Sequence, residues 1–324
     1  MQISVGTFNL NNLFSRYNFQ AKIGEDVEDE AGGITMTFGE DDFKVRTFKG
    51  RLVREKDPRD TETIATRIRD VMNADVLAVQ EVEHIQILKD FNRSHLGGMY
   101  PYVALIEGND PRMIDVGVMS KLPLGAITSH QTATHPDDPN RPVFGRDLLQ
   151  VEVLDDTGNR LLTLYNTHLK SHFVPFDQDQ EAGKIAANAR RRRQAEIVSK
   201  IISQQERRGG KFVLLGDMND PEDSGDLAPM LTVDGEGLTD GLANAIETRP
   251  SKAESPGQGN GPTSPQWTHR FNPDGPEPPR YELYDQVWLS PTLSPKLISA
   301  HIDRRTKHGG DGSDHDPVWV VIEL

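Results

Sequence analysis

The polar residues best suited to chemistry in this chain stand at the ends of short apolar segments. Asp314 and His315 come just before the apolar run 318–322. Four other apolar runs end in polar residues in the same way, at Asn9, Glu81, His168 and the pair Asp217/Asn219. Carboxylate and amide oxygens can hold a hard cation such as Mg²⁺, and an imidazole titrates near neutral pH. Because an α/β scaffold gathers strand ends from distant parts of the chain, these residues are candidates for one shared site.

Each of these features taken alone also has an ordinary structural interpretation. Gly216-Asp217-Met218-Asn219 has the composition of a turn. Glu81 is also placed to cap a helix, and His168 is equally compatible with a buried core histidine. Asp285 opens a further apolar run, so that either Asp285 or Asp314 is placed to orient the ring of His315. The joint occurrence of these features, more than any one of them, indicates a function.

Most of the chain consists of short apolar runs separated by helical patterns. Runs bounded by Gly, Pro, Asp or Asn predict strands at 3–8, 76–79, 102–106, 116–119, 148–154, 161–166, 212–215, 286–289 and 318–322. Apolar residues at helical spacing predict helices at 61–72, 85–91 and 182–205, with Asp60 as a candidate N-cap of the first. Strand–helix–strand units alternate with strand–strand pairs, which predicts two packed mixed sheets with helices outside.

Two stretches, 18–60 and 220–279, are predicted to be long loops, because they are rich in Gly, Pro, Ser and acidic residues. Strand patterns resume after both of them, so we expect one catalytic domain over residues 1–324.

The overall composition limits the possible chemistry. The chain has 36 Lys and Arg against 50 Asp and Glu, a formal net charge of -14, which suits a small or single-stranded substrate better than long duplex DNA. The absence of cysteine excludes disulfides, thiol nucleophiles and Cys-ligated zinc. No apolar run is long enough to span a membrane and no secretory signal is visible, so we expect a cytoplasmic protein.

Together, the motifs resemble the endonuclease/exonuclease/phosphatase superfamily, the deoxyribonuclease I-like proteins, and its bacterial-type members in particular. The matching segments are Thr7-Phe8-Asn9-Leu10, Gln80-Glu81, Asp115-Val116-Gly117-Val118-Met119-Ser120, Asn166-Thr167-His168-Leu169, Gly216-Asp217-Met218-Asn219, Asp285-Gln286-Val287 and Ser313-Asp314-His315-Asp316-Pro317-Val318. The resemblance covers nearly the whole chain. It implies a four-layered α/β sandwich, in which two packed mixed β-sheets are flanked by helices.

The resemblance also implies a role for each residue. Glu81 resembles the principal Mg²⁺ ligand, with Asn9 beside it and Asp314 completing the shell. Asp217 and Asn219 resemble the pair that orients the attacking water. His315 resembles the histidine that contacts phosphate, Asp285 its carboxylate partner, and His168 a second histidine near the leaving oxygen. An all-oxygen metal site suits Mg²⁺ or Mn²⁺, and hydrolysis by water needs no nucleophile from the chain.

Four further residues are candidates for binding the substrate or its phosphate, namely Asn11, Arg112, Asn166 and Arg190. In some repair endonucleases of the family an acid occupies the place of Asn11. Arg190 belongs to the run Arg190-Arg191-Arg192-Arg193, whose members sweep about 300° of a helix and cannot all face one ligand.

Three functions stay open at this point. The first is a metal-dependent nuclease acting on DNA or RNA, and the second is the same chemistry on a small-molecule or lipid phosphoester. The third is a catalytically inactive binding protein on the same fold. The expected partner is a phosphoester, with nucleic acid as the first candidate, and a monomer is the default.

Overall fold

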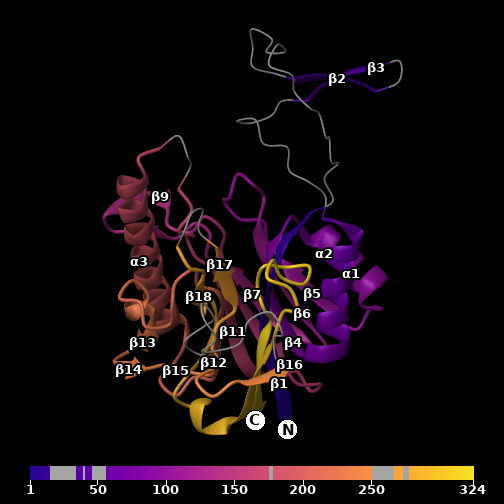
Figure 1. The fold of residues 1–324 in the computed structure, drawn as a ribbon. Helices are drawn as coiled ribbons and strands as arrows, with labels where there is room; N and C mark the ends of the chain where they lie inside the picture. The colour runs from indigo at the N-terminus through magenta and orange to yellow at the C-terminus, as the bar shows by residue number, and fades with distance from the viewer. Residues whose placement is uncertain (15–33, 39–40, 46–55, 175–177, 250–265, 273–276) are drawn as a thin grey trace.

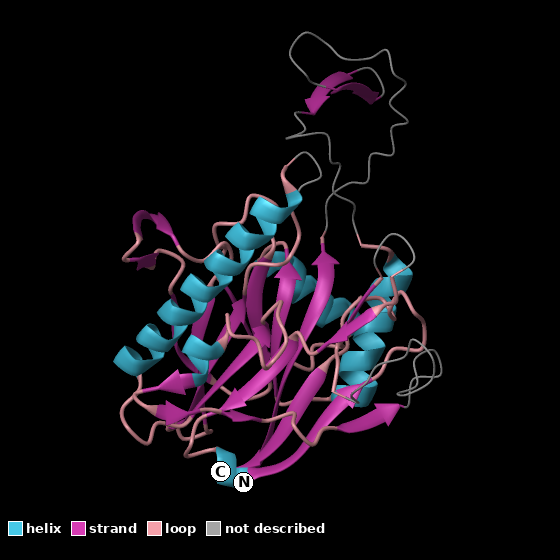
Figure 2. Cartoon of the chain, turned by 60° about the vertical axis from the view of Figure 1, so that its left-hand side comes forward, coloured by secondary structure: helices cyan, strands magenta, loops and turns pink. Residues whose placement is uncertain are grey.

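The computed structural model describes residues 1–14, 34–38, 41–45, 56–174, 178–249, 266–272 and 277–324. Two mixed β-sheets of these residues pack face to face, and helices cover both outer faces (Figures 1 and 2). The predicted class, a four-layered α/β sandwich, is confirmed. No helix of the described residues is long and apolar enough to cross a membrane.

The larger sheet has seven strands and the smaller has six. In order across the larger sheet they are β16 (Ile246–Arg249), β20 (Leu297–Asp303), β21 (Val318–Glu323), β1 (Gln2–Leu13), β4 (Val76–Val82), β6 (Asp115–Ser120) and β5 (Tyr102–Leu105). In the smaller sheet they are β15 (Thr239–Asp240), β19 (Asp285–Leu289), β12 (Phe212–Asp217), β11 (Arg160–His168), β10 (Leu148–Leu154) and β7 (Leu124–Ser129).

All nine predicted strands are present, some of them longer than expected. The sequence did not predict the strands β7, β15, β16 and β20. β7 is an edge strand with two exposed and four half-buried residues, so it lacks the continuous apolar run that marks a buried strand. β16 is also an edge strand, and β15 has only two residues.

Three helices cover the sheets. On the larger sheet lie α1 (Pro58–Thr66), continued by the π-helical turn η1 (Arg67–Met72), and α2 (Ile85–His95). On the smaller sheet lies the long helix α3 (Gln180–Gln205) with the short helix η2 (Ala228–Leu231). The predicted N-cap of the first helix was wrong. Asp57 caps it by accepting a hydrogen bond from the backbone N–H of Arg59, with Pro58 as the first helical residue.

Three apolar layers separate the four structural layers. Val5, Val76 and Val118 of the larger sheet meet Val151, Leu164 and Val213 of the smaller sheet in the central layer. Alternate residues of the same strands, such as Phe8 and Leu77, point the other way and pack on Ile64 and Leu88 of the helices. Strand alternation of this kind, with both faces apolar, explains why the sequence shows continuous apolar runs.

The two predicted loops have different outcomes. Most of 18–60 lies outside the described residues, which there form the hairpin β2 (Ile34–Phe38) and β3 (Asp41–Val45) and, from Pro58, the start of α1. The prediction of one long loop over 220–279 was wrong for its described part. That part contains η2, β15, β16 and the short strands β13 (Thr232–Val233), β14 (Glu236–Gly237) and β17 (His269–Phe271), the last paired with β18 (Arg280–Glu282). Elements of two to four residues are too short to produce a periodic pattern.

The remaining short elements are β8 (Thr134–His135), β9 (Asp138–Pro142) and η3 (Ser294–Lys296). The two chain ends lie side by side, where the N-terminal ammonium donates to the carbonyl oxygen of Leu324 at 3.0 Å (Figure 1).

The topology brings the polar strand ends to one edge of the sandwich. β1 and β4 are parallel, with Asn9 opposite Gln80, and β11 and β12 are parallel, with His168 opposite Asp217. β19 runs antiparallel to β12, so its first residue, Asp285, also faces Asp217. This edge lies at the end of the strands away from the two termini.

Candidate active site

Asp217 is the central residue of the site. Its Oδ2 accepts a hydrogen bond from Nδ2 of Asn9 at 2.9 Å and lies 3.3 Å from Nε2 of His168 and 3.8 Å from Nε2 of His315. Its Oδ1 accepts from the backbone N–H of Asn219 at 2.9 Å. Burial raises the pKa of Asp217 to about 7, with Asp285 adding to the rise and His315 opposing it. A carboxyl that titrates near neutral pH is suited to accept a proton from water.

The backbone at the end of β12 is shaped to present Asp217 and Asn219. Gly216 has a φ of 132°, and a Cβ at this position would collide with the carbonyl oxygen of Thr167 on β11. Glycine is therefore required here for the close approach of the two strands. Asn219 has a φ of 53°, and its side chain donates to the carbonyl oxygen of Leu169 at 3.2 Å.

His315 is held as a charged imidazolium by carboxylates. Its Nδ1 lies 2.6 Å from Oδ2 of Asp285, a fully buried residue, while its Nε2 points toward Asp217. Burial by itself would lower the pKa of His315, but Asp285 and Asp217 raise it well above its ordinary value. Of the two partners that the sequence left open, the structure pairs the ring with Asp285.

His168 is the second histidine of the site and is uncharged. It is almost completely buried, and burial together with the charge of Arg146 lowers its pKa well below 6.5. The two histidines beside Asp217 thus differ in charge, since His315 is bonded to the buried carboxylate of Asp285 whereas burial and the neighbouring positive charges keep His168 neutral.

Glu81, Asp314 and Asn9 form a group of oxygen donors next to Asp217. Glu81 has a φ of 59°, unusual for this residue type, and its Oε2 accepts from the backbone N–H of Asn12 at 3.0 Å. Burial and the neighbouring charge of Asp314 raise the pKa of Glu81, so two carboxylates repel each other here. The side chain of Asp314 is 48% exposed and thus open to solvent. With the amide oxygen of Asn9, these groups fit a hard divalent cation, which would relieve the repulsion.

Buried arginines fix the loop that carries Asp314 and His315. Arg305 donates to the carbonyl oxygens of Asp314 at 2.8 Å and Thr268 at 2.6 Å, and pairs with Asp316 at 3.2 Å. Arg67 bridges Asp316 and Asp303 from the π-helical turn. Thr268 in turn accepts the backbone N–H of Asp285 on its hydroxyl at 3.0 Å. This network aligns both members of the His315–Asp285 pair.

A group of basic residues lies beside the site. Arg112 and Arg146 both pair with Asp110, at 3.1 and 3.2 Å. Arg146, which the sequence did not single out, is buried and acts on the pKa of Glu81 and His168. Burial and the charges of Arg146, Arg112 and Arg190 lower the pKa of Lys170 to about 8. We call Arg112, Arg146, Lys170 and Arg190 the basic group.

The arginine run of α3 does not act as a unit. Arg191 is completely buried and pairs with Asp220 at 3.1 Å, whereas Arg192 is exposed and pairs with Glu196 at 3.3 Å. Arg190 lies at the basic group, because its charge lowers the pKa of Lys170 and the charge of Asp110 acts on its own pKa. Arg191 also lowers the pKa of Lys170, but its guanidinium is buried against Asp220.

Asn166, a predicted substrate contact, lies between the sheets and not at the site. Asn166 is completely buried between the sheets, where it donates to the carbonyl oxygens of Val79 and Gly117 and accepts from Gln80. All three bonds join the smaller sheet to the larger one, so the structure gives Asn166 no open face for substrate.

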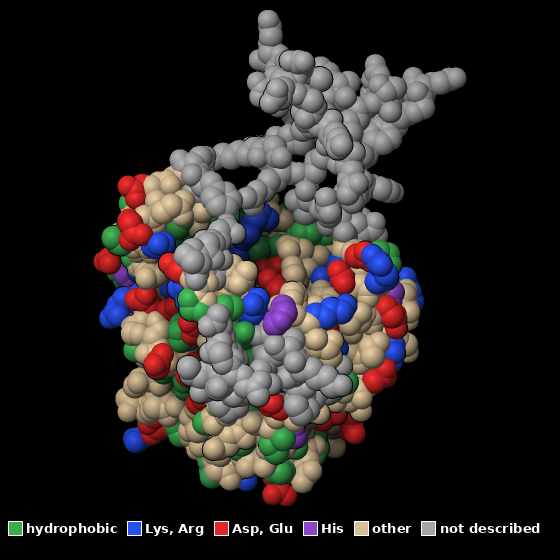
Figure 3. All heavy atoms as spheres, viewed as in Figure 1, with side chains coloured by type: hydrophobic (Ala, Val, Ile, Leu, Met, Phe, Trp, Pro, Cys, Tyr) green, Lys and Arg blue, Asp and Glu red, His purple; other side chains and the backbone are tan. Residues whose placement is uncertain are grey.

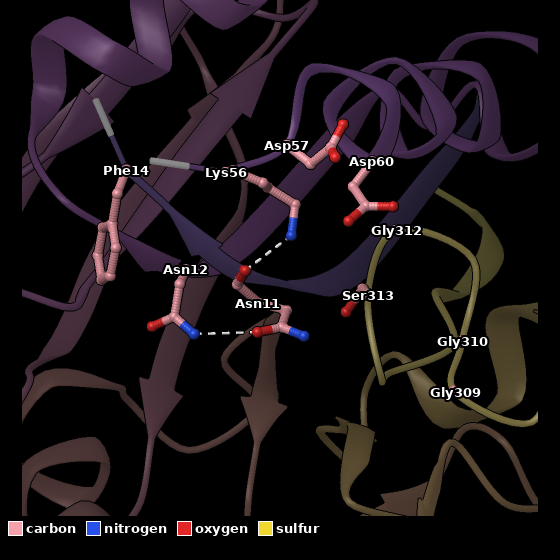
Figure 4. A pocket seen from close by; sticks show the side chains of 10 residues that line it. All are labelled: Asn11, Asn12, Phe14, Lys56, Asp57, Asp60, Gly309, Gly310, Gly312 and Ser313. Carbon is pink, nitrogen blue, oxygen red and sulfur yellow. Dashed lines mark hydrogen bonds between the residues drawn. The ribbon is translucent and has the colours of Figure 1, made fainter. Parts of the chain in front are cut away.

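Asn11 lines a polar pocket of about 370 Å³ next to the oxygen donors (Figure 4). Its carbonyl oxygen accepts from Nζ of Lys56 at 2.7 Å. Asp57, Asp60 and Ser313 complete much of the polar lining.

His269 is a histidine of the site that the sequence did not reveal. Its Nε2 lies 3.8 Å from Oδ2 of Asp314, and its ring is 4.9 Å from that of His315. His269, Asp314 and His315 form a cluster that could hold a metal ion. In the view of Figure 3, a histidine reaches the surface near the centre, with basic side chains on either side and an acidic one above it.

Comparison with known proteins agrees with this geometry. Residues 6–315 match the model of the Endonuclease/Exonuclease/phosphatase family, so the chain belongs to that family. A search of curated proteins found no match.

Solved structures of the same fold include three that cover both chains almost fully. The endonuclease/exonuclease/phosphatase from Bacteroides vulgatus has 16% identity and a TM-score of 0.60, with 100% of this chain and 99% of that chain covered. The mannosyl-6-phosphatase Bt3783 of Bacteroides thetaiotaomicron has 16% identity and a TM-score of 0.55, with 99% of this chain and 100% of that chain covered. Truncated TDP2 of Caenorhabditis elegans has 15% identity and a TM-score of 0.53, with 100% of this chain and 98% of that chain covered. At this identity the likeness establishes the fold, and the site residues carry the functional argument.

Proposed function

We propose that this protein is a divalent-metal-dependent hydrolase that cleaves phosphodiesters by attack of water on phosphorus, most simply a nuclease acting on DNA or RNA. The observation that carries the proposal is the environment of Asp217. One carboxylate of raised pKa lies between an amide of the oxygen-donor group and a charged histidine. Attack on a phosphoester needs such a proton acceptor next to positive charge.

The metal proposed for the site is Mg²⁺, with Mn²⁺ as a substitute. Glu81, Asp314 and the amide oxygen of Asn9 would hold it, since all three offer oxygen. When bound, the ion would supply positive charge to the phosphate oxygens and so make phosphorus more electrophilic.

The remaining residues have separate tasks in the proposed reaction. Asp217, oriented by Asn9 and Asn219, accepts the proton of the attacking water. His315, kept charged by Asp285, stabilises a phosphate oxygen as negative charge develops. Neutral His168, whose Nε2 lies 3.3 Å from Oδ2 of Asp217, contacts the leaving oxygen in this proposal.

The basic group supports a polyanionic substrate. Arg112 and Arg146 pair with the carboxylate of Asp110, and burial together with the charges of Arg146, Arg112 and Arg190 lowers the pKa of Lys170. Arg146 also acts on the pKa of Glu81 and His168, which places the group near the residues proposed to react. A second phosphate of a nucleic acid strand would meet them. The net charge of -14 favours a short or single-stranded ligand over a long duplex.

A phosphorylated sugar is the second candidate substrate. The pocket of Figure 4 is lined by two asparagines, Lys56 and two aspartates, a polar lining suited to hydroxyl groups. The mannosyl-6-phosphatase of B. thetaiotaomicron shares the fold, although its identity of 16% carries no argument about substrate.

A substrate panel tests the proposal. Metal-free protein is supplied with Mg²⁺ or Mn²⁺ and offered linear and circular DNA, RNA, bis-p-nitrophenyl phosphate and hexose 6-phosphates. Cleavage of nucleic acid supports the first candidate, and preference for a hexose phosphate supports the second. Binding of any of them without turnover in either metal would contradict catalysis and favour an inactive binding protein.

A further inference from the structure

The trio His269, Asp314 and His315 forms a second set of metal donors at the edge of the proposed active site. One donor atom from each residue lies within 4.8 Å of the other two. These separations are too long for hydrogen bonds among the three side chains. Two donors that bind one tetrahedral ion at about 2.1 Å lie about 3.4 Å apart, so the longest separation in the trio needs to contract by at most about 1.4 Å.

The rings are already oriented for such an ion. Nδ1 of His315 is bonded to Asp285 at 2.6 Å, which leaves Nε2, 3.8 Å from Oδ2 of Asp217, as the nitrogen that can bind an ion. Binding of the ion would displace the proton from Nε2. A carboxylate bonded to the far nitrogen of an imidazole is the usual support of a metal-bound histidine. His269 is fixed by backbone pairing with His315 and by stacking on Tyr284, with ring centroids 5.1 Å apart and planes within 13°.

The trio is accessible from solvent. Its half-exposed member, Asp314, has 48% of its side chain exposed, and the side chain of His269 is 17% exposed. An ion could therefore enter without opening of the sandwich.

The donor types differ from those of the oxygen group. Two imidazoles and one carboxylate are a set that zinc and neighbouring transition ions prefer, whereas Mg²⁺ prefers oxygen alone. Asp314 is common to both sets. An ion on the trio would remove Asp314 from the Mg²⁺ group and would occupy the nitrogen of His315 that faces Asp217.

We propose that His269, Asp314 and His315 bind one Zn²⁺-class transition ion, and that this ion inhibits the Mg²⁺-dependent reaction. The binding stands independently of that reaction, while the inhibition rests on the proposed function.

Zinc binding is measured first, without any substrate. Metal-free full-length protein competes with a chromophoric zinc chelator for Zn²⁺, and we expect one equivalent to bind. His269→Gln should weaken this affinity at least tenfold. His172→Gln is the matched control, because the ring of His172 also stacks on Tyr284, with centroids 6.0 Å apart, but lies outside the trio. This variant should change the zinc affinity less than twofold.

A second variant tests the site separately, in case His269→Gln does not fold. Asp314→Asn alters a half-exposed side chain and should also weaken zinc binding at least tenfold. Failure of wild-type protein to compete with the chelator, or equal affinity in wild type, His269→Gln and Asp314→Asn, would overturn the site.

Inhibition is measured second. Zn²⁺ added to the Mg²⁺-supported hydrolysis of bis-p-nitrophenyl phosphate should reduce the rate, and His269→Gln should need at least tenfold more zinc for the same loss. Stimulation of turnover by zinc would overturn the inhibitory effect. Absence of turnover with every divalent metal would overturn the proposed function, yet the chelator result would still decide the zinc site.

Discussion

The two sheets contribute different chemistry to the same edge of the molecule. The larger sheet supplies oxygen donors at the ends of β1 and β4, Asn9 and Glu81, whereas the smaller sheet supplies His168, Asp217 and Asp285. The loop before β21 adds Asp314 to the first set and His315 to the second. The hydrogen bond from Asn9 to Asp217 joins the two halves at 2.9 Å. The difference teaches that metal binding and proton transfer rest on different residues, most of them on different sheets, which meet in the loop that carries Asp314 and His315.

The largest expected effect belongs to His315, which pairs with Asp285 of the smaller sheet. His315→Ala should lower kcat roughly 10³- to 10⁴-fold, because it removes the charge that stabilises the phosphate oxygen. The Mg²⁺ concentration for half-maximal activity should stay within about twofold of wild type. Steady-state kinetics over a magnesium titration check this, and a large shift of the magnesium midpoint would contradict the division between the sheets.

Glu81→Gln should act on the oxygen-donor half. We expect kcat to fall roughly 10²- to 10³-fold and the Mg²⁺ midpoint to rise at least tenfold, since one carboxylate ligand is lost. Circular dichroism should show an unchanged fold. Near-normal activity at the wild-type magnesium concentration would rule out Glu81 as a ligand.

Asn166→Ala should weaken the interface between the two sheets and so lower the stability of the fold. It removes three buried hydrogen bonds, one from Gln80 and two to the carbonyl oxygens of Val79 and Gly117, which should lower the free energy of unfolding by about 2–4 kcal/mol. Urea unfolding measures the loss. Gln86→Ala, an exposed change on α2, should cost less than about 0.5 kcal/mol. An altered KM with unchanged stability would instead restore Asn166 as a substrate contact.

The smallest expected effect is a gain in stability from Asp217→Asn in EDTA. The pKa of Asp217 rises from 3.8 to about 7 on folding, so the folded state retains a proton that the unfolded state releases between these values. The free energy of unfolding of the wild type therefore falls as pH rises through this range, and the loss is complete above pH 7. The variant avoids this loss but gives up the attraction between Asp217 and charged His315, so it should be more stable by about 1–2 kcal/mol at pH 8 but not at pH 4.

Thermal unfolding against pH measures this gain. Asp155→Asn is a control in which the pKa shift has the opposite direction. Hydrogen bonds from Thr157 and Asn159 lower the pKa of Asp155 to about 2. Its carboxylate stabilises the fold above pH 3.8, so the variant should be less stable at pH 8. A destabilised Asp217→Asn at pH 8 would contradict the raised pKa.

Much of the fold follows from the sequence, because central strands buried on both faces produce continuous apolar runs. Strands such as β12 and β21 were predicted for this reason, whereas β7, at a half-exposed edge, has no such run. The polar ends of predicted strands could be listed for the same reason, and the structure brings Asn9, Asp217 and His315 together.

The residues that escaped prediction lie in irregular or very short elements. His269 stands in a three-residue strand within a stretch read as a loop, and Arg146 precedes β10 in a turn. Neither position has a periodic neighbour pattern, and only tertiary structure shows what surrounds it. Asn166 illustrates the reverse error, because a polar residue near a strand end was taken for a ligand contact although both its bonding groups serve the sheet–sheet interface.

The most direct test of the central claim is metal-dependent turnover by the stripped protein. Protein treated with EDTA is assayed on bis-p-nitrophenyl phosphate while Mg²⁺ or Mn²⁺ is added back, with Glu81→Gln in parallel. We predict no turnover without metal, saturable recovery with either ion, and recovery shifted to higher metal in the variant. Full turnover in EDTA, or identical metal titrations of wild type and variant, would contradict the account.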